Sequence, residues 1–249
     1  MELTPELVLK AYCSGVFPMA EGRNSDEVYW YDPEVRGVLP IEELHVSKKL
    51  KKTILKKTYT ITFDKAFADV ISKCADIRKD TWINDEIISL YTKLHDAGYA
   101  HSVEAWLDGE LVGGLYGISI GGAFFGESMF STATDASKVA LVYLVARLWK
   151  QGFTLLDAQF VNEHLKQFGI KEILKNNYMV FLEQALKLEV SFNKGYSLSE
   201  KLDPVSSEST SFSTGMLDKG CLLSGAASSI NSSGDSDVKL FLQSTTQTS

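Results

Sequence analysis

The chain has 249 residues, 45% of them hydrophobic and 23% charged, which is typical of a globular protein and excludes a wholly disordered or fibrous chain. Its net charge of −7 argues against a protein that coats nucleic acid with its whole surface. No apolar run approaches the roughly 20 residues of a membrane-spanning helix, so no membrane partner is expected. The three scattered cysteines predict neither a disulfide framework nor a zinc ribbon, and with the lack of a signal sequence they favour a reducing cytoplasm.

The first segment begins with a helix signal. Thr4 is a good N-cap, Pro5 suits the first helical position, and Gly15 closes the helix. Residues 17–33 are rich in aromatic and turn residues, which predicts an irregular loop used as a packing clamp or as part of a binding surface. We take residues 1–34 as a small N-terminal domain, residues 35–195 as the main domain, and residues 196–249 as a polar, mobile tail.

A basic segment follows at residues 48–57, which read KKLKKTILKK. Ser47 is a plausible N-cap, so we expect a short basic helix that ends near Lys57. The lysines are either a solvated helix face or a local positive patch on an acidic protein.

The central part of the chain alternates between helix and strand patterns. We expect a strand at 59–63, a helix at 66–74 and a helix at 84–98 with Asn84 as its N-cap. Period-two patterns then predict an antiparallel meander with strands at 101–107, 110–120 and 123–129. Asp108 and Gly109 form the first turn of this meander. Its dense glycines indicate either a binding face or a twisted core sheet.

The last patterned region contains the second polar group of interest. A long helix is expected at 135–150, an apolar strand at 153–160, and a short helix at 162–168. Because strand side chains alternate, Asp157 and Gln159 are expected to share one face. Beyond Pro204, serine and threonine dominate, which is typical of a mobile segment. The apolar run 238–242 is predicted to add an edge strand or a docking contact.

Standard catalytic motifs are missing from the sequence. There is no P-loop, dinucleotide-binding fingerprint or HExxH, the four histidines are dispersed, and Ser128 lies in GESMFS rather than GxSxG. Glu127 and Asp157 sit in apolar strands, where an unpaired carboxylate is costly to bury, so they are candidate site residues. A meander, a helix and a strand with two polar groups are arranged as in acyltransferases of the GNAT type.

Longer motifs show a more specific resemblance. The strings GGLYGISIGGAFFGESMFSTATDASKVAL, LLDAQFVNEHL and FGIKEI, with HSVEAWLDGELVGG, DTWI, WYDPEVRGVLP and LHVSKKLKK upstream of them, resemble the leucyl/phenylalanyl-tRNA–protein transferases over about residues 3–178. The resemblance implies an α/β (α+β) fold, with a small N-terminal domain and a GNAT-like domain whose sheet is largely antiparallel. It also implies a bacterial cytoplasmic enzyme that requires no metal or other cofactor. We expect the protein to be a monomer.

The activity implied by this resemblance is transfer of leucine, phenylalanine or, less well, methionine from aminoacyl-tRNA to a protein's N-terminus. Acceptors begin with arginine or lysine, and the products enter N-end rule degradation. Residue by residue, the match implies a reaction centre of Glu127, Asp157 and Gln159. It implies adenosine contacts by Trp82 and by Met19, where the family often has tryptophan. It also implies a pocket for the donor side chain, formed by Leu115, Phe124, Met129, Leu144, Leu148 and Leu156. Because an acidic protein that binds RNA needs a local positive field, the basic segment is predicted to bind the tRNA through Lys48, Lys49, Lys51 and Lys52.

Alternatives remain open on the residue patterns alone. The pocket residues would otherwise be core, and Trp82 would be a packing residue. A CoA-dependent N-acetyltransferase is a second hypothesis, but residues 131–135 lack the glycines that hold a pyrophosphate, and Asp135 would repel it. A non-catalytic module that binds tRNA or degrons is a third hypothesis.

Overall fold

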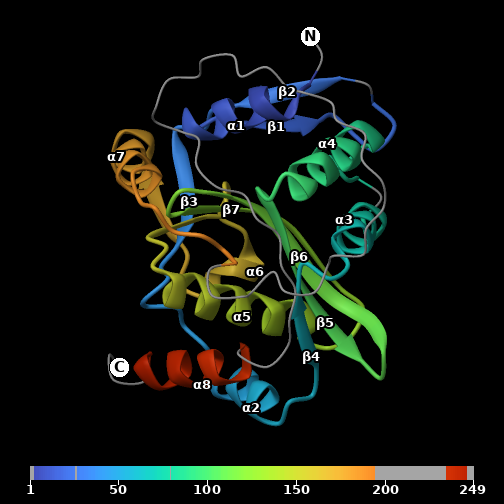
Figure 1. Ribbon diagram of the computed structural model, residues 1–249, viewed down its shortest axis with the longest axis vertical. Helices are drawn as coiled ribbons and strands as arrows, with labels where there is room; N and C mark the ends of the chain where they lie inside the picture. Colours follow the sequence, from blue (N-terminus) through green and yellow to red (C-terminus); the bar gives the residue numbers. More distant parts are fainter. Residues whose placement is uncertain (1–2, 26, 79, 194–233, 246–249) are drawn as a thin grey trace, which may run out of the picture.

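The computed structural model describes residues 3–25, 27–78, 80–193 and 234–245. In this part of the chain a seven-stranded sheet has the order β4-β5-β6-β7-β8-β3-β9, and a separate two-stranded sheet pairs β1 with β2 (Figure 1). Only β7 and β8 run parallel; the other pairs are antiparallel. The strands are β1 (Phe17–Ala20), β2 (Val28–Tyr31), β3 (Val35–Leu39), β4 (Thr60–Phe63), β5 (Ala100–Leu107), β6 (Glu110–Ile120), β7 (Ala123–Ser131), β8 (Leu155–Asp157) and β9 (Lys171–Leu174).

Helices cover both faces of the large sheet. One face packs against α5 and, beyond it, α2 and α8; the other packs against α1, α3, α4 and α7. Their bounds are α1 (Pro5–Cys13), α2 (Lys48–Leu55), α3 (Phe67–Asp76), α4 (Asp85–Asp96), α5 (Ala136–Gln151), α6 (Glu163–Lys166), α7 (Lys175–Leu186) and α8 (Gly234–Ser244). The mixed α/β fold with a mostly antiparallel sheet is therefore confirmed, while the GNAT likeness and the domain boundaries stay predictions.

The alternation of side chains along the central strands creates two hydrophobic cores. Leu115 and Phe124 join the core beneath α5, whereas their neighbours Tyr116 and Phe125 join the core beneath α1, α3 and α4. This is the expected consequence of the two-residue period of a strand. Both faces of the sheet are buried, which explains the nearly continuous apolar sequence of β6 and β7.

Local signals in the sequence predict most element ends correctly. The side chains of Thr4, Ser47 and Asn84 each accept a hydrogen bond from a backbone N–H in the first turn of their helices. Asp108 and Gly109 both have positive φ, at 52° and 84°, as the tight turn between β5 and β6 requires. These predictions are confirmed. They could be made from the sequence because each feature depends only on hydrogen bonds within a few residues.

The glycines of the meander have a packing role. A Cβ on Gly113 would lie 2.5 Å from the Cβ of Ala136, so this glycine lets α5 lie close to the sheet. A Cβ on Gly117 would lie 2.3 Å from the Phe125 carbonyl oxygen. At these two positions the twisted core sheet is the explanation, and not a binding face.

Several predictions are wrong. Residues 17–33 are not irregular, because β1 and β2 form a hairpin there. The strand predicted at 153–160 is only Leu155–Asp157, since Gln159 turns the backbone into the left-handed region with φ of 55°. Cys13 is disulfide-bonded, and Cys74 is a free, buried thiol.

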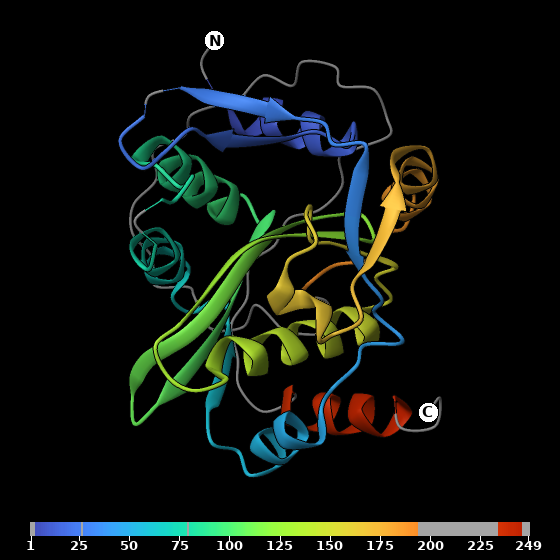
Figure 2. The same ribbon diagram turned by 180° about the vertical axis from the view of Figure 1, so that it is seen from behind.

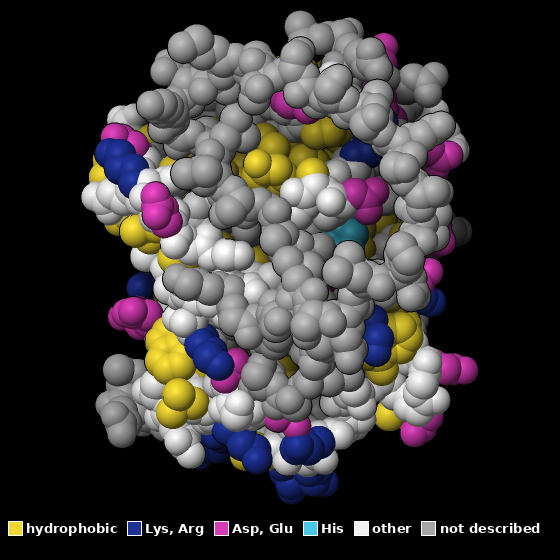
Figure 3. Space-filling view, in the orientation of Figure 1, with side chains coloured by type: hydrophobic (Ala, Val, Ile, Leu, Met, Phe, Trp, Pro, Cys, Tyr) yellow, Lys and Arg dark blue, Asp and Glu magenta, His cyan; other side chains and the backbone are white. Residues whose placement is uncertain are grey.

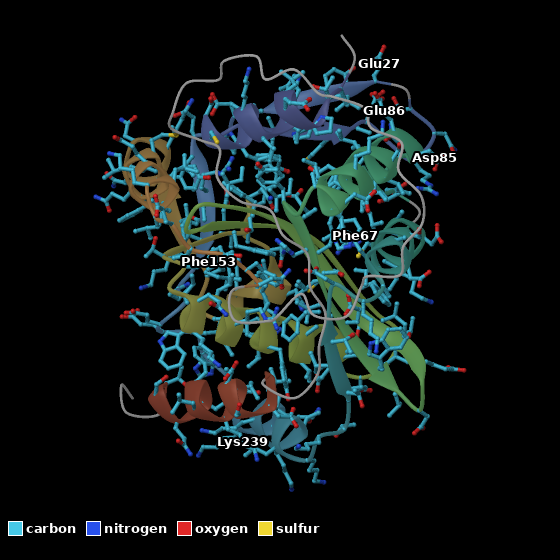
Figure 4. All side chains as sticks on the ribbon, viewed as in Figure 1. Glu27, Phe67, Asp85, Glu86, Phe153 and Lys239 are labelled. Carbon is cyan, nitrogen blue, oxygen red and sulfur yellow. The ribbon has the colours of Figure 1, made fainter. Side chains whose placement is uncertain are left out.

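The predicted tail contains a docked helix. Most of residues 196–249 lie outside the described residues. The prediction that this tail is mobile concerns those residues and stays a prediction. The apolar run 238–242 belongs to α8, which packs on α5 with Val238, Phe241 and Leu242 buried. Figure 4 shows Lys239 of α8 at one end of the molecule and Glu27, beside β2, at the other. The run therefore makes a docking contact, as a helix and not as an edge strand.

The docking of α8 predicts a specific loss of stability. Phe241 is fully buried and lies 5.9 Å from the ring of Trp149, so Phe241→Ala should lower the free energy of unfolding by about 3 kcal/mol. Leu240 on the same helix is 57% exposed, and Leu240→Ala should change the free energy of unfolding by less than about 0.5 kcal/mol. Urea unfolding of both variants measures the difference; equal stabilities would show that α8 does not hold to α5 in solution.

Candidate functional site

A cavity of about 670 Å³ opens between the sheet, α5, α6 and the segment that follows α3. Its walls combine apolar side chains with a few polar ones. The apolar members include Leu39, Leu115, Met129, Leu141, Leu144, Leu156, Leu165 and Trp82, and the polar ones include Arg78, Glu127, Ser128, Ser131, Gln159, Asn162 and His164. An apolar cavity with a few convergent polar groups is the usual form of a small-molecule or cofactor site.

Glu127 is the acidic centre of this cavity. Its Oε1 accepts hydrogen bonds from the Tyr12 hydroxyl at 2.7 Å and from Gln159 Nε2 at 3.1 Å, and the Tyr91 hydroxyl lies 3.4 Å from its Oε2. Burial nevertheless raises the pKa of Glu127 to about 8, helped by the charge of Asp157. With this pKa, the Glu127 carboxyl carries its negative charge in only part of the molecules at neutral pH.

Gln159 is buried and held at both its backbone and its side chain. Its N–H donates to Asp157 Oδ1 at 2.8 Å, and its carbonyl oxygen accepts from Gly37 N–H at 3.0 Å. With its Nε2 on Glu127, the other end of its amide, Oε1, is left to point away from the carboxylate. The residue therefore presents a fixed hydrogen-bond acceptor in the cavity wall.

Asp157 is fully buried behind this wall and does not line the cavity. Its Oδ2 pairs with Arg36 Nη2 at 2.5 Å and accepts from the Tyr178 hydroxyl at 2.7 Å. The prediction that Asp157 and Gln159 share one face of a strand is wrong. The strand ends at Asp157, and its carboxylate binds the backbone N–H of Gln159 instead.

The cavity gathers some of the other predicted residues but not all. Of the predicted donor pocket, Leu115, Met129, Leu144 and Leu156 line the cavity. Phe124 and Leu148 do not; they are buried in the core beside it. Trp82 lines the cavity and Met19 does not, although the next residue, Ala20, donates its N–H to the Trp82 carbonyl oxygen.

The four predicted tRNA-binding lysines lie on α2, away from the cavity walls. Lys48, Lys49 and Lys52 are exposed, whereas Lys51 is half-buried and donates to the Leu242 carbonyl oxygen of α8 at 2.9 Å. Lysine and arginine side chains gather over α2 and α8 at the lower end of the face in Figure 3. One of the four lysines therefore has a structural role as well.

Sequence reasoning missed the residues that hold the reaction centre in place. Tyr12 and Tyr91 lie in helices whose apolar patterns give no sign of a site, and the sequence analysis singles out neither Arg36 nor Tyr178. An arginine inside the apolar strand of residues 35–39 was the available signal, because a buried guanidinium needs a buried partner. Among the described residues no cluster of three or more histidine, cysteine, aspartate or glutamate side chains could hold a metal ion.

Comparisons with known proteins agree on one family. Residues 38–183 match the model of the leucyl/phenylalanyl-tRNA protein transferase, and residues 1–34 match that of its N-terminal domain. The chain therefore belongs to the leucyl/phenylalanyl-tRNA–protein transferase family, a family of aminoacyltransferases. No helix in the described part of the chain is long and apolar enough to cross a membrane.

Three bacterial relatives carry the name leucyl/phenylalanyl-tRNA–protein transferase. That of Paramagnetospirillum magneticum is 54% identical over 195 residues, covering 77% of this chain and 93% of the relative. That of Maricaulis maris is 51% identical over 191 residues, covering 76% and 88%. That of Hyphomonas neptunium is 51% identical over 194 residues, covering 77% and 75%.

The ion pair behind the cavity generates a stability prediction. Arg36→Leu would leave the Asp157 carboxylate buried without its cation and should lower the free energy of unfolding by about 3–5 kcal/mol. Lys171→Leu removes an exposed pair with Glu43, whose side chains are 60% and 65% exposed, and should cost less than about 1 kcal/mol. Urea unfolding compares the two variants, and a similar small loss in both would contradict the role given to Arg36.

Proposed function

We propose that this protein transfers leucine, phenylalanine or, less well, methionine from aminoacyl-tRNA to the α-amino group of proteins that begin with arginine or lysine. In this proposal it acts as a monomer in the cytoplasm, and its products enter N-end rule degradation. The observation that carries the proposal is the hydrogen bond between Gln159 Nε2 and Glu127 in the wall of an apolar cavity. It places an oriented amide oxygen beside a space suited to an uncharged side chain.

The donor side chain is proposed to occupy the apolar part of the cavity, formed by Leu115, Met129, Leu144 and Leu156. These side chains offer shape and no polar partner, which favours leucine, phenylalanine and methionine over polar residues. Trp82 is proposed to stack on the terminal adenosine, a contact that aromatic rings make with any base. Met19 lies outside the cavity wall, so Trp82 carries this contact in our proposal.

The proposed chemistry needs no external energy source, because the donor ester is already activated. The acceptor nitrogen attacks the ester carbonyl carbon, the new amide bond forms, and the bond to the ribose oxygen breaks. The proton lost by the amine ends on that ribose oxygen. Gln159 Oε1 accepts a hydrogen bond from the attacking amine and so directs its lone pair at the carbonyl.

Glu127 and Asp157 have different parts in this proposal. Glu127 fixes the direction of the Gln159 amide, and the approach of a cationic acceptor favours its ionised form and lowers its pKa from about 8. Asp157 acts as a positioning residue through the backbone N–H of Gln159 and does not take the proton itself. Membership of the transferase family favours this reaction over a CoA-dependent acetyl transfer or a purely binding role.

The direct test is amino acid transfer with Gln159 altered. The wild-type protein should transfer leucine from Leu-tRNA to an Arg-initiated peptide and should use no acetyl-CoA. Gln159→Ala should lower kcat by about 10²-fold while the donor KM stays within about twofold, because the amine is no longer oriented. An enzyme that lacks Gln159 and turns over normally would contradict the assignment.

The exposed lysines of α2 predict how the donor is captured. Changing Lys48, Lys49 and Lys52 to glutamine should raise the KM for aminoacyl-tRNA about tenfold and flatten its salt dependence, because fewer phosphate contacts are neutralised. Transfer from aminoacyl-adenosine, which lacks the RNA chain, should not change.

A matched control removes the same charge elsewhere. Lys166, Lys171 and Lys187 are exposed lysines paired with surface glutamates, and their glutamine variant should leave the tRNA KM unchanged. If both triple variants weaken tRNA binding equally, α2 has no special part and net charge alone explains the effect.

A further inference from the structure

A group of exposed aromatic side chains lies beside the candidate site. Among the described residues, the exposed aromatic side chains are those of Tyr29, Trp30, Tyr31, Phe160 and Phe181. Three of these form what we call the aromatic surface: Tyr29, Tyr31 and Phe160, which are 46%, 39% and 44% exposed. The cavity and its reaction chemistry leave this surface unexplained, since none of the three lines the cavity.

The aromatic surface is held together by one buried ring. Phe17 of β1 stacks on Tyr31 at 6.0 Å between ring centroids and meets Phe160 edge-on at 5.7 Å. In the β1–β2 hairpin, Phe17 pairs with Tyr31 and Met19 pairs with Tyr29, so the two tyrosines share a face of the hairpin. Figure 2 shows β3 running from this hairpin down into the large sheet.

The aromatic surface begins one residue after the reaction centre in the chain. Phe160 follows Gln159 directly, and the segment is fixed because the Gln159 carbonyl oxygen accepts from Gly37 of β3. An extended chain spans about 3.3–3.6 Å per residue, so three or four residues cover about 10–14 Å. This length is comparable to the two ring spacings of 5.7 Å and 6.0 Å that lead from Phe160 through Phe17 to Tyr31. A peptide whose first nitrogen is held at Gln159 can therefore pass over this surface.

Carboxylates adjoin the two tyrosines of the aromatic surface. Tyr29 donates to Glu27 at 2.5 Å, Asp32 follows Tyr31 and pairs with Lys175, and Glu34 is exposed. Negative charge of this kind repels the phosphates of RNA and attracts cationic or neutral chains. The charge pattern therefore favours the acceptor peptide over the tRNA as the molecule that lies on this surface.

We propose that Tyr29, Tyr31 and Phe160 bind the N-terminal segment of the acceptor protein, over roughly its second to fourth residues, as an extended neutral or cationic peptide. This inference rests on the proposed function, since it assumes that the acceptor amine reaches Gln159. Aromatic faces stack on peptide groups and on the side chains of arginine and lysine, which explains binding without a fixed sequence.

The test compares acceptors of different length. Arginine amide is the short acceptor, and an eight-residue Arg-initiated peptide is the long one. In the wild-type protein the long peptide should have a KM about tenfold lower than the short one. A long peptide with glutamate at its second to fourth positions should lose that advantage, because the surrounding carboxylates repel it.

Tyr31→Ala and Phe160→Ala should each remove most of the length dependence. The KM of the long peptide should rise about five- to tenfold, while kcat, the donor KM and the KM of the short acceptor stay as in the wild type. Phe181→Ala on α7 removes an aromatic ring that is 46% exposed elsewhere, and it should change none of these values. Two independent variants guard against a local folding defect near Gln159.

The outcomes separate this inference from the proposed function. No transfer to either acceptor would overturn the proposed function itself. Transfer with the same KM for short and long acceptors would overturn the aromatic surface alone. A rise in the tRNA KM of Tyr31→Ala or Phe160→Ala, without a change for the acceptor, would assign the surface to RNA and overturn the inference.

Discussion

The buried pair of Arg36 and Asp157 is the constraint on which the rest of the site depends. The Arg36 guanidinium joins β3 to β8 through Asp157, to the end of α1 through the Gly15 carbonyl oxygen, and to α7 through the Tyr178 hydroxyl. It also lies over the rings of Phe17 and Tyr178. Two charges removed from water are costly unless they are paired with each other, so these four elements have one favoured arrangement.

That arrangement determines the geometry of the cavity wall. One oxygen of Asp157 is used by Arg36 and Tyr178, which leaves the other for the backbone N–H of Gln159. Gln159 can then keep its left-handed conformation, which is uncommon for a residue other than glycine. The conformation turns its side chain towards Glu127, so a charge pair deep in the protein controls the direction of one amide at the surface of the cavity.

The sequence predicts the local features of this structure well and the long-range ones poorly. Helix starts at Thr4, Ser47 and Asn84 and the turn at Asp108 follow from contacts between neighbouring residues. Arg36 and Tyr178, the partners of Asp157, lie 121 residues before it and 21 residues after it, and no periodic pattern in the sequence predicts these contacts. The longer motifs identified the family and some of the cavity-lining residues, but a one-residue backbone turn at Gln159 changed which atom Asp157 binds.

The wide spacing of these partners has a consequence for biosynthesis. Tyr12, Arg36, Glu127, Asp157 and Tyr178 meet at one place, and pairings across such separations form slowly because long loops must close first. While the ribosome is still adding residues before Tyr178, the Asp157 carboxylate lacks one of its donors and α7 cannot close over it. The site is therefore complete only after α7 has been synthesised and has packed against β3 and β8.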